Sequence, residues 1–544
     1  MSENRQSPGP RSRRINPGKC PRVATEDGRI LLPCELMSLG EPRLNRTNGE
    51  VQPSIWWQAL YSRDRRFDGR FFIGAATAKI YCRPVCPVPF ARPNNLVWFA
   101  SAAAAEAAGY RPCRRCRPET SPGTPAWLGT SAIVSRALRL ISEGALDENG
   151  VEELSSRVGL GSRQLRRLFV EHLGASPLKL AITHRVHFAR NLIEETDLPI
   201  TKIALSAGFR SIRQFNHAVR AVCGQSPTQL RRVREEVPAS FQSGLVIRLA
   251  YRPPFDWLAL VDFLRPRATP GVELVQDSSY RRTISVGGST GIIDVRPSQT
   301  ESALTVRVEL PGYQFLMKVV ERVRRIFDLG ADPLRIADDL SRNRRLKPLL
   351  DRRPGLRVPG AWDGFELAVH AILGQQLTAA DSTTLVGALV QTFGRPVQTS
   401  LQGLTHLFPR PEDLVDADLS RVGIHGARAE TLHRLARSVC GSELTFAASM
   451  TLEEAVSRIC GIRGIDENTA HYIAMRVMGE PDAFPFADPG LRHSLGKDGK
   501  PAPPSELLRI AEDWRPWRAY AAMHLYAAGR AAGPRVTASS AFAD

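Results

Sequence analysis

Four cysteines at two close spacings are the residues of this sequence best arranged for chemistry. Cys82 and Cys86 form one pair, and Cys113 and Cys116 form a second pair after an interval of 26 residues. Close pairs of thiols, brought together by an intervening loop, are a common way to build a tetrahedral zinc–thiolate site. The spacing predicts Zn²⁺ as a cofactor held by these four residues, and by itself it favours an ion that only stabilises a small domain.

A second arrangement suits contact with a phosphate backbone. The residues Arg463-Gly464-Ile465-Asp466 separate two helical patterns, over 452–460 and 468–478. A tight hairpin between two helices points backbone N–H groups at a phosphate. Arg463, Gly464 and Asp466 are therefore candidate DNA contacts.

An internal repeat marks the region from about 127 to 236. Its repeated positions are Gly159-Leu160, Leu165, Gly174 and Ser176-Pro177, then Gly208-Phe209, Phe215, Gly224 and Ser226-Pro227. A glycine at each turn allows the left-handed backbone that two perpendicular helices need, so the repeat predicts a tandem helix-turn-helix.

The second helix of each repeat is expected to expose side chains suited to base edges and phosphates. We expect Ser162 and Ser211 to cap these helices. A solvated charged face is the alternative interpretation, which is weaker for two copies in register. The candidate DNA-binding residues are Arg163, Gln164, Arg166 and Arg167, followed by Arg213, Gln214, Asn216 and His217.

Composition supports a multidomain protein that binds a polyanion. A chain of 544 residues is too long to fold around a single hydrophobic core, so three to four domains are expected. The net charge of +18 favours nucleic acid as a partner, with a merely soluble basic protein as the alternative. No transmembrane run or signal peptide is found, so a cytosolic location is expected. In that compartment the nine cysteines indicate metal or reactivity rather than disulfides.

The expected fold is multidomain α+β. The zinc domain should be small, and the tandem helix-turn-helix should be all-α. The last half should open with a small α/β sheet domain, because residues 245–249 alternate in polarity. It should continue as an all-α helix-hairpin-helix domain. The expected segments are a disordered basic arm at 1–52 (Met37 is an alternative start), the zinc domain at 53–124, the helix-turn-helix domain at 127–236, the sheet domain at 244–327, the helical domain at 328–530 and a disordered tail at 531–544.

The cysteine cluster resembles the N-terminal domain of the Ada alkylation-response proteins, over roughly residues 54–121. The matching motifs are RRFDG at 65–69, IYCRPVC at 80–86 and RPCRRCRP at 111–118. The resemblance implies that Cys82 is both a zinc ligand and the acceptor of a methyl group from a DNA methylphosphotriester. Zinc would keep that nucleophile deprotonated at neutral pH.

The repeat resembles the AraC-family DNA-binding domain, over about 100 residues. The pattern runs from Gly208-Phe209 to Phe215 and closes with Gly224-Gln225-Ser226-Pro227. The resemblance implies two recognition helices that enter successive major grooves.

The last half resembles the helix-hairpin-helix glycosylases of the AlkA type, over about 244–528. Beside the hairpin, the matching motifs are RPPFDW at 252–257, AILGQQ at 371–376, FPFADPG at 484–490 and WRPWRAY at 514–520. The resemblance implies that Asp488 is the catalytic carboxylate, with a helix N-cap as a compatible alternative. It also implies that Gln376 fills the gap left by a flipped base.

Pocket residues carry over with two departures. Trp517 and Tyr472 are the aromatic candidates for binding an electron-poor base, and core packing is their alternative role. Asp466 replaces a hairpin glycine, and Asn468 replaces a pocket tryptophan. Neither a four-cysteine cluster after the catalytic region nor a lysine at the hairpin is found, so a monofunctional enzyme without an iron–sulfur cluster is expected.

These parts together predict an alkylation-response protein of bacterial type. The expected activities are a DNA-3-methyladenine glycosylase and a single-turnover methyl acceptor that strengthens sequence-specific DNA binding. The expected partners are double-stranded DNA, both alkylated DNA and promoter DNA, and RNA polymerase. No association with a membrane is expected. The protein is expected to be a monomer in the cytoplasm, associated with the nucleoid. The alternatives are a transcription activator whose glycosylase half is weak or lost, and a DNA-binding scaffold with structural zinc. The Pro-Cys-His-Arg motif of the Ada alkylguanine transferase is absent, so that activity is not expected.

Overall fold

The computed structural model describes most of the chain between residues 53 and 531. The described ranges are 53–89, 95–123, 132–148, 150–231, 244–375, 377–446, 450–496 and 500–531, together with the short strands β1 (Val23–Ala24) and β2 (Ile30–Leu31). The arm and the tail that were predicted to be disordered lie almost wholly outside these residues.

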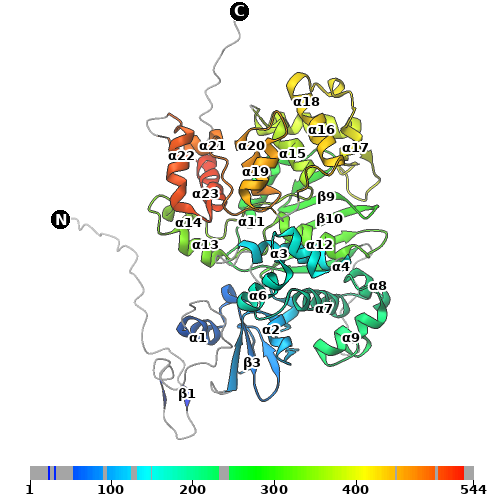
Figure 1. Cartoon of the computed structure of the whole chain (residues 1–544), viewed down its shortest axis with the longest axis vertical. Helices are drawn as coiled ribbons and strands as arrows, with labels where there is room; N and C mark the ends of the chain where they lie inside the picture. Colours follow the sequence, from blue (N-terminus) through cyan, green and yellow to red (C-terminus); the bar gives the residue numbers. More distant parts are fainter. Residues whose placement is uncertain are drawn as a thin grey trace, which may run out of the picture.

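The cysteine-rich domain is a small four-stranded sheet with a helix packed on each face, α1 (Pro53–Ser62) on one and α2 (Ala102–Ala107) on the other (Figure 1). Phe71 directly precedes β3 (Phe72–Ala75) and continues its alternation, so Phe71 and Ile73 pack with Trp98 on one face of the sheet, and Phe72 packs with Tyr81 on the other. The strand order is β5 (Leu96–Phe99), β3 (Phe72–Ala75), β4 (Ile80–Cys82) and β6 (Arg111–Pro112), and the helices are α1 (Pro53–Ser62), η3 (Arg65–Phe67), α2 (Ala102–Ala107) and η5 (Pro118–Thr120).

The next domain is entirely helical in its described residues, as predicted. Gly159 and Gly208 occupy equivalent turns at φ of +73° and +75°, which is the left-handed backbone expected there. Ser211 caps its helix, but the prediction for Ser162 is wrong: Gly161 is the cap residue and Ser162 is the first helical residue. The helices are α3 (Ala132–Ser142), α4 (Ala145–Glu148), α5 (Val151–Arg157), α6 (Ser162–Leu173), α7 (Pro177–Glu195), α8 (Ile200–Ser206), α9 (Ile212–Cys223) and α10 (Pro227–Arg231).

A five-stranded antiparallel sheet opens the last half of the chain. In β7 (Leu245–Ala250) the side chains of Ile247 and Leu249 are buried and that of Arg248 is exposed, which is the predicted alternation. The strand order is β7 (Leu245–Ala250), β11 (Ala303–Glu309), β10 (Ser289–Pro297), β9 (Ser279–Val286) and β8 (Glu273–Gln276), and α11 (Trp257–Leu264), η6 (Arg265–Arg267) and α12 (Leu316–Ile326) accompany it.

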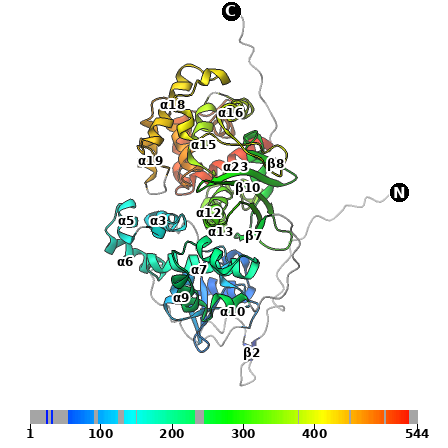
Figure 2. The same cartoon turned by 90° about the vertical axis from the view of Figure 1, so that its right-hand side faces the viewer.

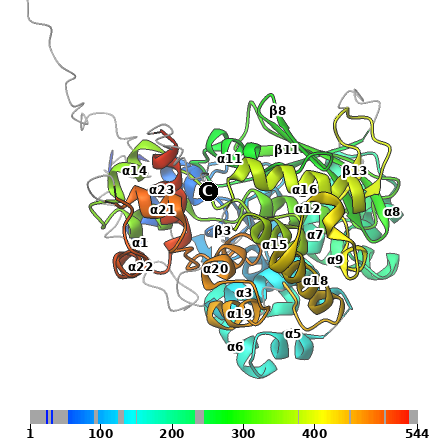
Figure 3. The ribbon, with the colours of Figure 1, turned by 90° about the horizontal axis from the view of Figure 1, so that it is seen from above.

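The remainder is mostly helical, as predicted, with one short strand pair, β12 (Arg395–Pro396) and β13 (His406–Leu407). Helix α20 (Glu467–Arg476) lies between α15 (Gly364–Leu373) on one side and α21 (Pro489–Ser494) and α23 (Arg518–Ala531) on the other (Figures 1 and 3). The helices are α13 (Pro333–Leu340), α14 (Lys347–Arg352), α15 (Gly364–Leu373), α16 (Ala379–Phe393), α17 (Pro411–Leu414), η7 (Leu419–Val422), α18 (Gly426–Cys440), α19 (Leu452–Cys460), α20 (Glu467–Arg476), α21 (Pro489–Ser494), α22 (Pro504–Ala511), η8 (Glu512–Trp514) and α23 (Arg518–Ala531).

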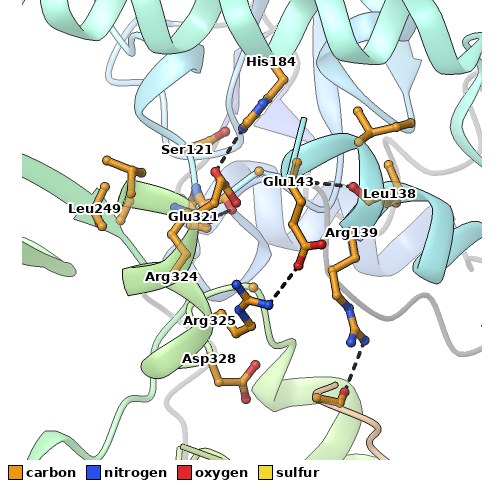
Figure 4. Close-up of a pocket in the computed structure, with 18 of the residues that line it drawn as sticks. Ser121, Leu138, Arg139, Glu143, His184, Leu249, Glu321, Arg324, Arg325 and Asp328 are labelled. Atoms are coloured by element: carbon orange, nitrogen blue, oxygen red, sulfur yellow. Dashed lines mark hydrogen bonds and ion pairs between the residues drawn. The ribbon is translucent and has the colours of Figure 1, made fainter. Parts of the chain in front are cut away.

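The helix-turn-helix domain joins the other two parts. Helix α7 lies between the cysteine-rich domain and the last half of the chain (Figures 1 and 2). On the latter side His184 faces Glu321 at 3.3 Å, and Glu143 pairs with Arg325 at 3.0 Å (Figure 4). Apolar side chains of α7 and β7 belong to one continuous buried cluster. None of the described helices is both long and apolar enough to span a bilayer.

Candidate functional sites

The four cysteines predicted as metal ligands converge at one end of the first sheet. Parallel pairing places Tyr81 of β4 opposite Pro112 of β6, so the next residues, Cys82 and Cys113, are neighbours. The four Sγ atoms lie within 4.8 Å of one another. A tetrahedral zinc site with Zn–S bonds of about 2.3 Å needs sulfurs about 3.8 Å apart, so this cluster fits the ion. Cys82 is half-buried and the other three are buried, which makes Cys82 the thiol most open to a reactant.

Hydrogen bonds link the four thiols and the loop that follows Cys82. Bonds with the other three thiols, first with Cys113, raise the pKa of Cys82. Arg83 fixes the following loop, because its backbone N–H donates to Cys116 Sγ at 3.4 Å and its guanidinium donates to Cys116 O at 3.0 Å. The same guanidinium forms a buried ion pair with Asp68.

A buried carboxylate, that of Glu106, contacts Tyr81 and joins this domain to α7. The Tyr81 hydroxyl donates to Glu106 Oε1 at 2.9 Å, and Thr183 Oγ1 donates to Glu106 Oε2 at 2.5 Å. His187 Nε2 lies 2.9 Å from Glu106 Oε1. Burial opposes ionisation of Glu106, but these hydrogen bonds, first that of His187, hold the pKa of its carboxyl below the usual range. Through Glu106, Tyr81, which precedes Cys82 in the chain, is linked to Thr183 and His187 of the helix-turn-helix domain.

The candidate recognition helices expose the predicted residues. Leu165 of α6 and Phe215 of α9 point into the helical core, which turns the opposite faces to solvent. The exposed side chains include all eight candidates, namely Arg163, Gln164, Arg166, Arg167, Arg213, Gln214, Asn216 and His217.

A cavity of about 1390 Å³ lies among α11, α15, α20, α21 and α23, and Asp488 and Tyr472 line it. Asp488 also caps α21, since its Oδ1 accepts from the Leu491 N–H at 3.1 Å. Both roles considered for this residue are therefore geometrically compatible. Burial raises the pKa of Asp488 above its usual range, although hydrogen bonds, first from Leu491, oppose the rise.

Arg476 holds the Tyr472 ring in the cavity wall near Asp488. Arg476 Nη1 donates to the Tyr472 hydroxyl at 2.6 Å, and Arg476 Nη2 donates to Gly360 O at 3.1 Å. Burial opposes ionisation of Tyr472, but the positive charge of Arg476 lowers its pKa. Tyr526 and Arg267 also line the cavity, and neither was predicted. The only sequence signal for Tyr526 is a large ring in an alanine-rich helix, which does not say which face meets the cavity.

A buried ionic network also lines the cavity. Arg282 pairs with Glu273 at 3.3 Å and with Glu366 at 2.8 Å. Burial raises the pKa of Glu366 to about 7, and burial lowers the pKa of His370 to about 4, so His370 is neutral at neutral pH. These residues come from β8, β9 and α15, and no local pattern of the sequence brings them together.

Trp517 and Gln376, two predicted pocket residues, are not among the described residues that line the cavity. Trp517 is only 2% exposed, and its Nε1 donates to Asp339 Oδ2 at 2.9 Å. It packs in the core and is not among the described residues that line the cavity. Gln376 lies outside the described residues, although its neighbour Gln375 lines the cavity.

The hairpin has the expected position at the start of α20. Gly464 has φ of +106°, and a Cβ there would lie 1.9 Å from Thr431 Oγ1, so only glycine fits. Asp466 does not use the left-handed backbone that it could tolerate: at φ −84° it caps α20, and its carboxylate accepts from the Thr469 N–H at 2.7 Å. Arg463 is exposed.

Comparison with known proteins accounts for this combination of sites. A protein of Mycobacterium tuberculosis (strain H37Rv), described as a probable bifunctional transcriptional activator/DNA repair enzyme AlkA, is 40% identical over 475 residues, which cover 86% of this chain and 95% of the relative. The chain belongs to this family. Three family models match successive parts of it: the metal binding domain of Ada at 55–119, a helix-turn-helix domain at 154–233 and the AlkA N-terminal domain at 246–363.

Other relatives of this AlkA-family chain match its parts separately. DNA-3-methyladenine glycosylase 2 of Escherichia coli is 32% identical over 282 residues, 51% of this chain and 95% of the relative. The bifunctional transcriptional activator/DNA repair enzyme Ada of the same organism is 29% identical over 185 residues, 34% of this chain and 51% of the relative. A solved 3-methyladenine DNA glycosylase from Archaeoglobus fulgidus has a TM-score of 0.46 at 22% identity and covers 52% of this chain and 98% of its own.

The matched Ada domain contains all four cysteines, and Zn²⁺ is the ion of this site. Bound zinc supplies the positive charge that keeps its thiolates deprotonated. The cysteines provide the ligands, and the partial exposure of Cys82 leaves one sulfur accessible at the surface.

Proposed function

We propose that this AlkA-family chain is both an alkylation-response regulator and a hydrolytic DNA glycosylase that removes alkylated purines of the 3-methyladenine type. The observation that carries the glycosylase role is the Asp488 carboxylate at the wall of a large cavity, beside Tyr472 and Tyr526. An alkylated purine carries positive charge and leaves easily, so the enzyme need not protonate it. A carboxylate in a site from which most water is excluded stabilises the positive charge that develops on the sugar in the transition state.

The remaining cavity residues suit the binding of a flipped, electron-poor base. Tyr472 and Tyr526 offer ring faces, and each such cation–π contact is worth roughly 0.5–2 kcal/mol. The base must leave the stack to reach them. None of the described residues that line the cavity is a lysine, which supports water as the nucleophile and a monofunctional enzyme. Gln376 is proposed as the wedge, and Arg463, Gly464 and Asp466 as the phosphate-facing turn.

We further propose that Cys82 accepts a methyl group from a DNA methylphosphotriester. A bond forms between Sγ and the methyl carbon, the carbon–oxygen bond breaks, and the phosphate leaves as a diester anion. Zinc with four thiolates has a formal charge of −2, which becomes −1 after methylation. The lost charge removes a repulsion from DNA on the order of 1–4 kcal/mol at a few ångströms, so methylation strengthens binding.

DNA is the proposed partner of every part. We propose that the exposed residues of α6 and α9 read a promoter, where RNA polymerase is the next partner. We also propose that the protein is a monomer that acts in the cytoplasm at the nucleoid. We propose the domain limits 53–124, 127–236, 244–327 and 328–530 for independent units of function, with flanking arms at 1–52 and 531–544.

DNA alkylated with a labelled methyl group tests the proposal. The expected result is label both as free base and on the protein, with Asp488→Asn losing only base release and Cys82→Ala losing only methyl uptake. Label on the protein alone would favour a regulator with a lost glycosylase. Free base alone would leave the zinc structural, and neither product would leave only a DNA-binding protein.

A further inference from the structure

Two side chains of α20 hold the segment of backbone that leads to Asp488. Asn468 Oδ1 accepts from the Ala487 N–H at 2.8 Å, and His471 Nδ1 accepts from the Phe484 N–H at 3.3 Å. These bonds lie one and four residues before Asp488 in the sequence. Residues 484–487 belong to neither a helix nor a strand, so side-chain acceptors replace the partners that a ladder would supply.

The His471 ring must be neutral, because its Nδ1 accepts a hydrogen bond from the Phe484 N–H. Because Nδ1 accepts, the ring proton is on Nε2, which faces Glu467 Oε1 at 4.0 Å. Burial lowers the pKa of His471 to about 4, so the ring is neutral at neutral pH. The rings of His471 and Phe486 meet edge to face with centroids 6.0 Å apart, which adds an apolar contact to the same segment.

The same helix begins at the hairpin. Asp466 caps α20 through the Thr469 N–H, and Asn468 lies in the first turn between these two residues. Beyond Asp488 the chain is fixed again, because the Asp488 side chain caps α21. The carboxylate is therefore held from both sides: α20 fixes the backbone before it, and its own cap fixes its rotamer.

We propose that Asn468, assisted by His471, is a positioning residue that fixes the 484–487 segment to α20 and so sets the place of the Asp488 carboxylate relative to DNA held at the hairpin. This inference rests on the proposed glycosylase activity. The role explains why asparagine stands at position 468: the residue lines the cavity, and its side-chain oxygen binds the Ala487 backbone N–H instead of extending the aromatic wall.

The test uses the full-length zinc-loaded chain and duplex DNA with labelled methylpurines. Asn468→Ala is expected to lower the single-turnover rate of base release about ten- to hundredfold, because the lost bond lets the carboxylate shift. Affinity for duplex DNA containing a tetrahydrofuran abasic-site analogue should stay within about twofold. Asn468→Asp keeps an acceptor and should recover most of the rate at the alkaline plateau, where both carboxylates are ionised.

Asn343→Ala is the matched control. Asn343 Oδ1 also accepts one backbone N–H, that of Arg345 at 3.0 Å, but it does not line the cavity, so its rate should equal that of the wild type. Hydrogen exchange measured at the Ala487 and Phe484 amides checks the contact without relying on activity, and both should exchange faster in Asn468→Ala.

Three outcomes would overturn the inference. One is an Asn468→Ala rate within about threefold of wild type. Another is weakened DNA binding without rescue by Asn468→Asp, which would make Asn468 a substrate contact instead. The third is unchanged exchange at Ala487. Absence of base release by the wild type would refute the proposed glycosylase, and the exchange measurement would still decide whether Asn468 holds the segment.

Discussion

Replacing Asp488 by asparagine should separate the charge of this residue from its structural role. Asp488 caps α21 by accepting from the Leu491 N–H, and asparagine caps helices about as well as aspartate. Asp488→Asn therefore keeps the cap and removes only the negative charge. A unit charge about 4 Å from a sugar cation, at an effective dielectric constant of about 20, contributes about 4 kcal/mol. That energy corresponds to roughly a thousandfold in rate.

The assay is single-turnover release of labelled base, with thermal unfolding as the check on the fold. Asp488→Asn should lose about a thousandfold in rate with an unchanged melting temperature. Asp488→Ala should lose the rate and, in addition, about 1 kcal/mol of stability from the missing cap. A rate for Asp488→Asn within about tenfold of wild type would refute the reasoning, because the carboxylate would then not stabilise the transition state.

The same carboxylate should set the acid limb of the rate profile. The active form is ionised, and burial raises the pKa of Asp488, so the rate should rise with pH through a value above the usual aspartate range. The residual rate of Asp488→Asn should lack this limb. A limb at the ordinary aspartate pKa would contradict the burial argument.

Three further predictions follow from other parts of the molecule. Gly464→Ala should weaken DNA affinity because its Cβ would overlap Thr431 Oγ1, and retention of full affinity in a binding titration would show that the hairpin does not contact DNA. Glu106→Gln should lower the free energy of unfolding by about 1–3 kcal/mol at neutral pH. Because folding lowers the pKa of Glu106, its carboxylate contributes this stability fully above the unfolded pKa and loses it as the pH falls through the folded pKa. The difference in unfolding free energy between wild type and variant, measured with denaturant, should therefore narrow at low pH. An unchanging difference would exclude the carboxylate charge as its source. Chelation of zinc should abolish methyl uptake at Cys82 and spare base release, and loss of both in parallel assays would mean that the metal supports the whole fold.

Features encoded by local spacing could be predicted from the sequence. The Cys82–Cys86 and Cys113–Cys116 pairs identify a metal site because a short chain segment fixes which thiols can share an ion. The repeated glycines at 159 and 208 identify the turns of the tandem helices because few other residues adopt that backbone. The sequence predicts a cap at Ser162, whereas Gly161 occupies that position in the structure, because glycine is also accepted at a helix N-cap.

Which side chains share the cavity was decided only by tertiary structure. Trp517 and Tyr526 are both large rings in the same stretch of sequence, yet Trp517, just before α23, packs in the core, whereas Tyr526, within α23, lies on the face that lines the cavity. The bond from Ala487 to Asn468 joins residues 19 apart, and the bonds of Glu106 to Thr183 and His187 cross a domain boundary. The sequence by itself determined which chemistry each segment carries, through residue type and local period; the tertiary structure decided which groups meet, because such meetings depend on the packing of elements that no local pattern relates.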